Sequence, residues 1–164
     1  MSRDIFALMA VEEGFRETPY YDSLNYPTIG IGMRIGPRNA PLSQYQFKMP
    51  RTAAEVWVRC HLDELVQDID TNPRYSQIKQ VLQYLRGRAT SNDYADARIA
   101  VLLSMGYQMG LDGLAKFVNT LKFMGQGDFT KAAVNMLASQ WARQTPNRAK
   151  RHAEQMKTGV WYAY

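Results

Sequence analysis

Apolar residues near the start of the chain recur at the spacing of a helix. They are Ile5, Leu8 and Met9, which fall on one side of a helix over residues 5–13. Gly14 follows directly, and a glycine at this place is typical of the left-handed residue that ends a helix. The pattern therefore predicts a short amphipathic helix whose last turn carries two adjacent carboxylates, Glu12 and Glu13.

The period changes over residues 18–36, where two short runs flank the turn-rich stretch "DSLNYP". This arrangement predicts a β-hairpin. After the turn, apolar residues alternate with polar residues or glycine as on one face of a single strand; they are Ile29, Ile31, Met33 and Ile35. Gly30 and Gly32 on the other face indicate that backbone or a ligand approaches closely. A loop or ragged strand with three prolines follows over residues 37–50.

A long helix is predicted over residues 52–72. Thr52 and Glu55 fit a capping box, and Pro73 marks the end of the helix. The apolar stripe of this helix consists of Val58, Leu62, Leu65 and Ile69. Cys60 is interpreted as a small residue of the core.

Everything after Pro73 has helical periodicity. The predicted helices cover residues 76–86, 94–108, 113–124, 130–141 and 146–157. Thr145 is the expected N-cap of the last helix, and Gly159 its end. We therefore predict an α+β protein with one domain, residues 1–164. Its expected parts are a small β-containing lobe at about 13–60, a connecting helix at 52–72, and a helical lobe of residues 1–12 and 74–164.

The composition is that of an ordinary globular protein, with 46% hydrophobic and 21% charged residues in 164. The single cysteine excludes an intramolecular disulfide and a metal site of several cysteines. His61 and His152 stand apart from other metal-ligand residues and are interpreted as surface residues, so we expect no metal and no cofactor. No stretch fits a signal peptide or a membrane span, so any target outside the cytoplasm is expected to require a separate export route.

The net charge of +5 favours an anionic partner. Nucleic acid, acidic lipid and bacterial wall polymers all qualify by charge. The last predicted helix carries one acid, Glu154, against four basic residues, Arg148, Lys150, Arg151 and Lys157. We favour a solvated basic face attracted to the anionic outer-membrane surface of bacteria over nucleic-acid binding. A membrane-disrupting side activity of this helix is a further hypothesis.

Glu13 and Asp22 would meet if the chain turns directly from the first helix into the hairpin. Two carboxylates across a cleft can hydrolyse a glycosidic bond, one by protonating the leaving oxygen and the other by activating water or attacking the sugar. The end of the helix disfavours a negative charge on Glu13 by roughly 0.3–1 kcal/mol. Asp22 lies in a polar turn and is expected to stay ionised, and the hydroxyl of Thr28 can hold a water. Spacing alone does not choose between Glu12 and Glu13.

Three stretches resemble the T-even phage lysozymes, glycoside hydrolase family 24. They are "EEGFRETPYYDSLNYPTIGIG", "AVLLSMGYQMGLDGLAKFVNTLKFM" and "AAVNMLASQWARQTPNRAKRHAEQMKTGVWYAY". The resemblance covers about residues 1–34 and 97–164. It implies a lysozyme-like fold and a muramidase that cleaves the β-1,4 bond between N-acetylmuramic acid and N-acetylglucosamine in peptidoglycan. It further implies a monomeric phage or prophage endolysin that acts in the periplasm after holin-type release.

The resemblance also implies roles for individual residues. It makes Glu13 the general acid, Asp22 the base or charge stabiliser and Thr28 the residue that orders the attacking water, in an inverting reaction. The glycan-contacting positions of the family fall on Arg34, Tyr107, Thr120 and Asn135. Arg148 is expected to point toward Glu13 and to favour its ionised form. The sequence departs from the family at Arg34, where relatives have an apolar residue, and at Met33, where they commonly have histidine.

Two other functions fit the same sequence. The chain could be a wall-binding module that kept the fold and lost the chemistry, or a protein that kills through its cationic helix alone. The presence of all three signature residues, Glu13, Asp22 and Thr28, favours the enzyme.

Overall fold

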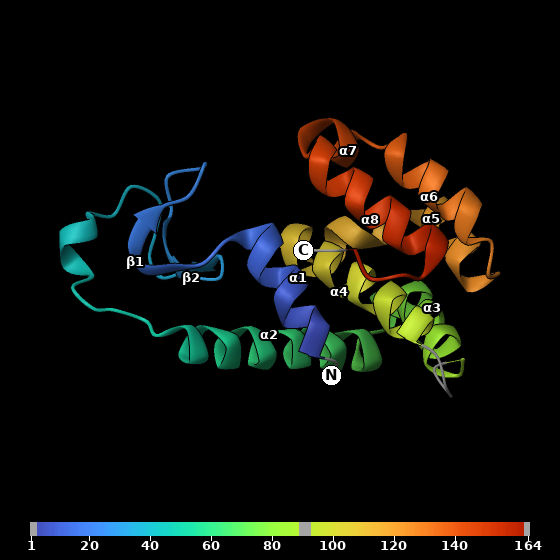
Figure 1. Ribbon diagram of the computed structural model, residues 1–164, viewed down its shortest axis with the longest axis horizontal. Helices are drawn as coiled ribbons and strands as arrows, with labels where there is room; N and C mark the ends of the chain where they lie inside the picture. The colour runs from blue at the N-terminus through green and yellow to red at the C-terminus, as the bar shows by residue number, and fades with distance from the viewer. Residues whose placement is uncertain (1–2, 89–92, 163–164) are drawn as a thin grey trace. The chain divides into compact units, whose positions relative to one another are not determined.

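The computed structural model describes residues 3–88 and 93–162 (Figure 1). The chain divides into two compact units, one over residues 3–61 and one from residue 62 onward. The first unit holds a three-stranded antiparallel sheet, and the described part of the second is helical, so the predicted α+β fold is confirmed. This division groups residues 3–12 with the sheet rather than with the later helices. The predicted assignment of lobes stays a prediction.

Helix α1 (Arg3–Glu13) ends where the sequence predicted, at the second of its two glutamates. Gly14 takes the left-handed conformation that stops it, with φ +73°. The three apolar residues of the predicted stripe, Ile5, Leu8 and Met9, are all buried. The end of α1 therefore has a fixed place from which the chain turns directly into the sheet.

The sheet runs in the order β1 (Arg16–Tyr21), β2 (Pro27–Gly30), β3 (Met33–Arg34). The prediction of a single strand over residues 29–35 is wrong, because Ile29 pairs with Met33 and the chain reverses between them. Gly30 and Gly32 make this reversal possible by taking φ values of +64° and +72°. The pairing of β1 with β2 is irregular between Arg16 and Tyr20, where Pro19 has no N–H to donate.

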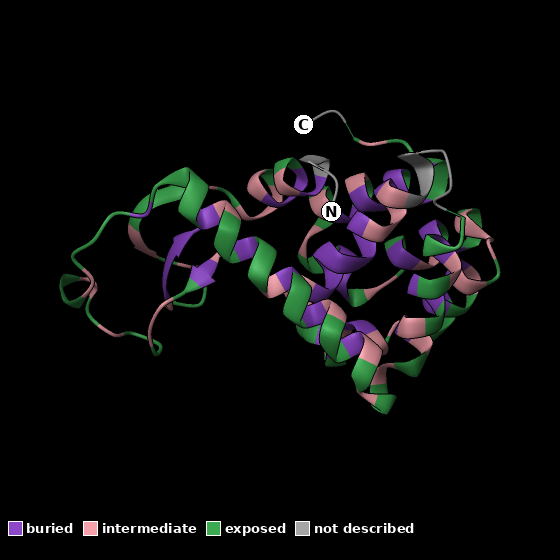
Figure 2. Cartoon of the chain, turned by 90° about the horizontal axis from the view of Figure 1, so that it is seen from below, coloured by how far each residue is buried: buried purple, intermediate pink, exposed green. Residues whose placement is uncertain are grey.

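Residues 37–50 form a loop with one short 3₁₀ helix, η1 (Leu42–Gln44), before α2 (Arg51–Thr71). The predicted capping box is wrong, because the helix begins one residue before Thr52 and its first N–H···O bond runs from Ala54 to Pro50. All four residues of the predicted apolar stripe of α2 are buried. Figure 2 shows buried and exposed stretches alternating along this long helix. Cys60 lies off that stripe and is exposed, so its interpretation as a core residue is also wrong.

The second unit contains a 3₁₀ turn and six helices in its described part, besides the end of α2. They are η2 (Pro73–Tyr75), α3 (Ser76–Arg86), α4 (Asp93–Ala115), α5 (Val118–Gly125), α6 (Phe129–Leu137), α7 (Gln140–Gln144) and α8 (Pro146–Thr158). α3 has the predicted bounds, and α4 is interrupted at Gly110, whose φ is +73°. The predicted helix over 113–124 is divided near Phe117, and that over 130–141 is divided at Ser139.

Ser139 and Thr145 precede the last two helices, α7 and α8. The side chain of Ser139 accepts a hydrogen bond from the Ala142 amide and so starts α7 as a separate helix. Thr145 stands at the predicted N-cap of α8, but its hydroxyl donates to the carbonyl of Trp141 instead, at 3.0 Å. α8 ends at Gly159, which has φ +74° as predicted.

His152 is fully buried on α8, so its interpretation as a surface residue is wrong. Its Nε2 lies 2.9 Å from the hydroxyl of Ser104, and its ring packs 6.0 Å from that of Trp141. The helical pattern carried this signal, because position 152 falls within the apolar stripe formed by Ala149, Ala153 and Met156.

Arg98→Met is expected to lower the free energy of unfolding by about 1.5–3 kcal/mol. The guanidinium of Arg98 donates to the carbonyls of Met156 and Lys157 at 2.8 and 3.0 Å and lies 3.8 Å from the Phe129 ring centroid. Its loss would leave the last turn of α8 without these donors. Urea unfolding measures the effect.

Arg88→Met is the matched control for this change. Arg88 also stacks on an aromatic ring, that of Tyr84 at 4.5 Å, but is exposed, so its removal is expected to cost less than about 0.5 kcal/mol. Equal losses from both variants would show that the carbonyl contacts of Arg98 add nothing to stability.

Candidate active site

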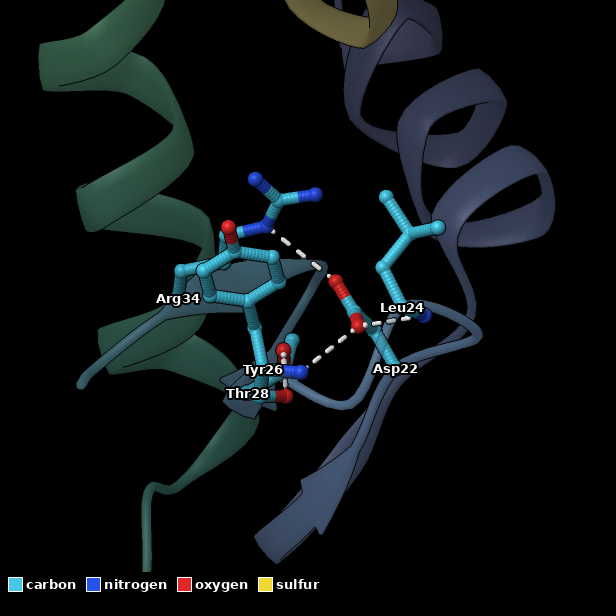
Figure 3. Close-up of polar contacts among 5 residues, drawn as sticks. All are labelled: Asp22, Leu24, Tyr26, Thr28 and Arg34. Carbon is cyan, nitrogen blue, oxygen red and sulfur yellow. Dashed lines mark hydrogen bonds and ion pairs between the residues drawn. The ribbon is translucent and has the colours of Figure 1, made fainter. Parts of the chain in front are cut away.

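Asp22 follows β1 and is held by the turn that leads into β2. Its Oδ1 accepts hydrogen bonds from the amides of Leu24 and Tyr26, at 2.8 and 2.9 Å (Figure 3). Asn25 takes the left-handed conformation in this turn, with φ +62°, which asparagine tolerates better than most residues. The turn predicted from "DSLNYP" therefore serves to fix one carboxylate oxygen.

Arg34 reaches the other oxygen of Asp22 from β3. Its Nε lies 3.1 Å from Asp22 Oδ2, and its guanidinium carbon lies 4.3 Å from the centroid of the Tyr26 ring. Figure 3 shows the guanidinium beside this ring and directed at the carboxylate. Both oxygens of Asp22 are thus engaged within the first unit.

These contacts keep Asp22 ionised. Burial disfavours the charged carboxylate, but the hydrogen bonds from Tyr26 and Leu24 and the charge of Arg34 outweigh burial. The pKa of Asp22 is therefore lowered from its ordinary value of 3.8. A carboxylate of this kind stays negative at neutral pH, as the sequence analysis expected of Asp22.

Glu13 is the last residue of α1, and its side chain packs against the reversal between β2 and β3. An ideal Cβ placed on Gly32 would lie 3.1 Å from Glu13 Oε2 and 3.2 Å from Glu13 Cβ. The sequence predicted that another group approaches Gly32 closely, and that group is the side chain of Glu13. This contact shows that Glu13, one of the two adjacent glutamates that the sequence left open, packs on the sheet.

Tyr20 was missed by the sequence analysis, although it stands near both carboxylates. Burial raises its pKa above the ordinary value of 10.0; the charge of Arg16 opposes this rise, and the negative charges of Glu13 and Asp22 add to it. The negative charges of both carboxylates therefore disfavour ionisation of the same phenol. Tyr20 lies in the short run that precedes the turn at Asp22, and no pattern in that run set it apart from its neighbours.

Thr28 lies opposite Tyr20 in the pairing of β1 with β2 and is buried. Its hydroxyl donates to the carbonyl of Tyr26 at 2.9 Å. The hydroxyl oxygen then retains acceptor capacity, since a threonine oxygen has two lone pairs. Thr28 can hold a water by accepting a hydrogen bond from it.

Gly32→Ala is expected to lower activity about tenfold by displacing Glu13. The new methyl group would meet the Glu13 side chain at little more than 3 Å, and the positive φ costs roughly 1–2 kcal/mol in stability. Gly110→Ala is the control, because Gly110 has φ +73° and open space around its Cβ position. Similar losses of stability in both variants, but of activity only in the first, are the expected result. Full activity of the Gly32 variant would contradict the packing role of this glycine.

The other predicted site residues lie in the second unit. Thr120 and Asn135 are brought together, since the Thr120 hydroxyl donates to Asn135 Oδ1 at 3.1 Å. Asn135 also lines a pocket of about 580 Å³ together with Phe117, Trp141 and Gln144. The Trp141 indole donates to Gln108 at 2.8 Å. Glycan contacts by these residues and by Tyr107 stay predictions.

Arg148 is on α8, in the second unit, and its predicted contact with Glu13 stays a prediction. Among the described residues, no group of three or more His, Cys, Asp or Glu side chains is arranged to hold a metal ion. None of the described helices combines the length and apolar character needed to cross a membrane.

Comparison of the sequence with known proteins shows which family it resembles. The profile of the phage lysozyme family matches residues 10–155. The chain is 28% identical to probable T4-type lysozyme 1 of Dictyostelium discoideum, over all of this chain and 99% of that protein. Probable T4-type lysozyme 2 of the same organism is 23% identical, over 96% and 95% of the two chains.

A further relative belongs to a phage particle. The chain is 28% identical to the pre-baseplate central spike protein Gp5 of Enterobacteria phage T4, over 93% of this chain and 27% of Gp5. The match therefore covers nearly the whole of this chain but only part of that protein.

Proposed function

Since the chain belongs to the phage lysozyme family, we propose that it cleaves the β-1,4 bond between N-acetylmuramic acid and N-acetylglucosamine by general acid/base catalysis. It is a glycoside hydrolase whose family implies peptidoglycan as substrate. The observation that carries the proposal is that the negative charges of two carboxylates both help to raise the pKa of the Tyr20 phenol. One, Asp22, is held ionised, and the other, Glu13, is packed on Gly32.

In the proposed reaction, Glu13 gives its proton to the glycosidic oxygen as the bond from that oxygen to the sugar C1 breaks. Asp22 takes a proton from water as the water oxygen bonds to C1. Thr28 accepts a hydrogen bond from the same water and so fixes its direction. Glu13 and Asp22 then return to their starting protonation states by exchange with solvent.

The position of Asp22 suits a charge that must persist while the sugar becomes positive. The transition state of glycoside hydrolysis resembles an oxocarbenium ion, which a nearby carboxylate stabilises. Because the pKa of Asp22 is lowered from its ordinary value of 3.8, its negative charge is retained at neutral pH. The charge of Asp22 can stabilise the transition state even when the water loses its proton only after the glycosidic bond has begun to break.

Host-cell lysis is our proposal for the biological role. Peptidoglycan lies outside the cytoplasmic membrane, so lysis further requires passage to that side, for which we propose holin-type release. The net charge of +5 would attract the protein to anionic bacterial surfaces. We expect a monomer to be sufficient, since Glu13, Asp22 and Thr28 all lie in one unit of one chain.

The test is an assay on purified peptidoglycan that measures binding and new reducing ends in the same sample. Hydrolysis is expected to release muramic acid reducing ends, which borohydride reduction and mass spectrometry identify. Binding without new reducing ends would instead favour a wall-binding module. Release of glucosamine reducing ends would show that the enzyme cleaves the other linkage of the strand.

A further inference from the structure

Arg34 occupies a position for which the resemblance implied a glycan contact, but the structure gives it a partner within the protein. Its Nε donates to Asp22 Oδ2 at 3.1 Å, and its guanidinium lies 4.3 Å from the Tyr26 ring centroid. Stacking on an aromatic ring restricts the plane of a guanidinium. Arg34 is therefore held so that it presents a donor to Asp22.

The two oxygens of Asp22 are held by different parts of the chain. Oδ1 is fixed by amides of its own turn, whereas Oδ2 is fixed by Arg34, twelve residues later on β3. An ionised carboxylate has about four acceptor sites. Three are occupied by these bonds, which leaves one on Oδ2 for a water. The contact with Arg34 thus controls the oxygen that remains available.

We propose that Arg34 is a positioning residue for the hydrolysis, whose guanidinium, stacked on Tyr26, holds Oδ2 of Asp22 in place to receive the proton of the attacking water. This inference rests on the proposed function, because it requires Asp22 to act on that water. Other titratable and charged groups in this part of the chain are Glu13 and Arg16, whose charges act on the Tyr20 phenol as that of Asp22 does. Tyr26 is a further one, and its ring lies under the Arg34 guanidinium. Arg34 is the cation paired directly with the carboxylate in the described residues.

Arg34→Leu is expected to move the acid limb of the kcat/KM profile to higher pH. At the acid end, kcat/KM should fall about twofold to fivefold, the range of a partly exposed ion pair, with most of the change in kcat. Arg34→Lys restores the charge without the planar fork, so it should recover part of the acid limb. Tyr26→Leu keeps the backbone amide that bonds Asp22 but removes the ring under Arg34, and should shift the limb less and in the same direction.

Arg74→Leu is the matched control. Arg74 also forms an exposed ion pair, with Asp112 at 3.0 Å, but it lies in the second unit. Its removal lowers the net charge by the same amount and so reports any general loss of attraction to anionic peptidoglycan. We expect its pH profile to match that of the unchanged protein.

Carboxyl ¹³C NMR of Asp22 supplies a readout that does not depend on activity. In the Arg34→Leu variant, Asp22 should titrate at higher pH than in the unchanged protein. An unchanged titration together with an unchanged acid limb would overturn the proposal. A rise in KM with an unchanged limb would also overturn it, in favour of a direct glycan contact by Arg34.

The two proposals can fail separately. Full activity of Asp22→Asn would refute the role of Asp22 and with it this inference, whatever the titration shows. Loss of activity in Asp22→Asn, with no effect of Arg34→Leu on the limb or on the titration, would refute the role of Arg34 alone.

Discussion

Glu13→Gln is expected to lower the release of reducing ends from purified peptidoglycan about 10³-fold, within the range of general acid catalysis. Glutamine keeps the size and the packing on Gly32 but has no proton of suitable acidity to give to the leaving oxygen. The thermal unfolding transition should stay close to that of the unchanged protein, because the packing against Gly32 is retained.

Glu12→Gln is the control that the chain itself provides. Glu12 is the adjacent carboxylate in the same turn of α1, and its change should alter activity by less than about twofold. Activity of Glu13→Gln near that of the unchanged protein would remove Glu13 from the mechanism. An equal loss in both variants would point to a general effect of charge at the end of α1.

Asp22→Asn is expected to lower kcat about 10²- to 10³-fold, the scale of a lost electrostatic contact to the transition state. Asparagine can still accept the two amide bonds through its oxygen, but its NH₂ group then faces the Nε donor of Arg34. The variant therefore loses both the negative charge and the bond to Arg34. Steady-state kinetics on soluble glycan fragments measures the change.

The pH dependence follows from the direction of the pKa of Asp22. Because this pKa is lowered in the folded protein, the stabilising effect of the ionised carboxylate is present above the ordinary aspartate value of 3.8. It is lost as the pH falls through the lowered pKa. The acid limb of activity that belongs to Asp22 should therefore lie below the ordinary aspartate range and disappear in Asp22→Asn.

Asp128→Asn is the matched control for Asp22→Asn. Asp128 also accepts a backbone hydrogen bond, from Lys131, and pairs with that side chain, and its pKa is likewise lowered. It belongs to the second unit, at the start of α6. Its change should leave kcat within about twofold. Loss of activity in both variants alike would contradict a specific role of Asp22.

Local patterns predicted much of the fold. The stop of α1 and the end of α8 were each marked by the glycine that follows the helix, Gly14 and Gly159. The bounds of α3 followed from helical periodicity. The apolar stripe of α2 also predicted its buried face, because burial of a helix follows its period. The same period shows why Cys60 is exposed: it stands two residues from Val58 and so points elsewhere.

The errors arose where two local patterns compete. Alternating isoleucines predicted one strand over residues 29–35, but two left-handed glycines reverse the chain within it. The predicted helix over 113–124 is divided near Phe117, where the sequence has neither proline nor glycine. At Ser139 the side chain caps a new helix, which the apolar pattern did not reveal.

The sequence predicted which residues belong to the candidate site, but it did not predict the contacts that these residues make. Spacing and resemblance identified Glu13, Asp22 and Thr28. The packing of Glu13 on Gly32 and the ion pair of Asp22 with Arg34 depend on how β2 and β3 pair, which a wrong strand prediction could not provide. The roles of these residues in catalysis stay predictions for the experiments above.

A leaving group that needs no proton tests the central claim most directly. If Glu13 serves to protonate the glycosidic oxygen, its removal should matter little when the sugar carries fluoride or dinitrophenolate instead. On a peptidoglycan-derived oligosaccharide with such a group, the rate ratio of unchanged protein to Glu13→Gln is expected to fall from about 10³ to below about 10. An undiminished ratio on the activated substrate would contradict the assignment of Glu13 as the general acid.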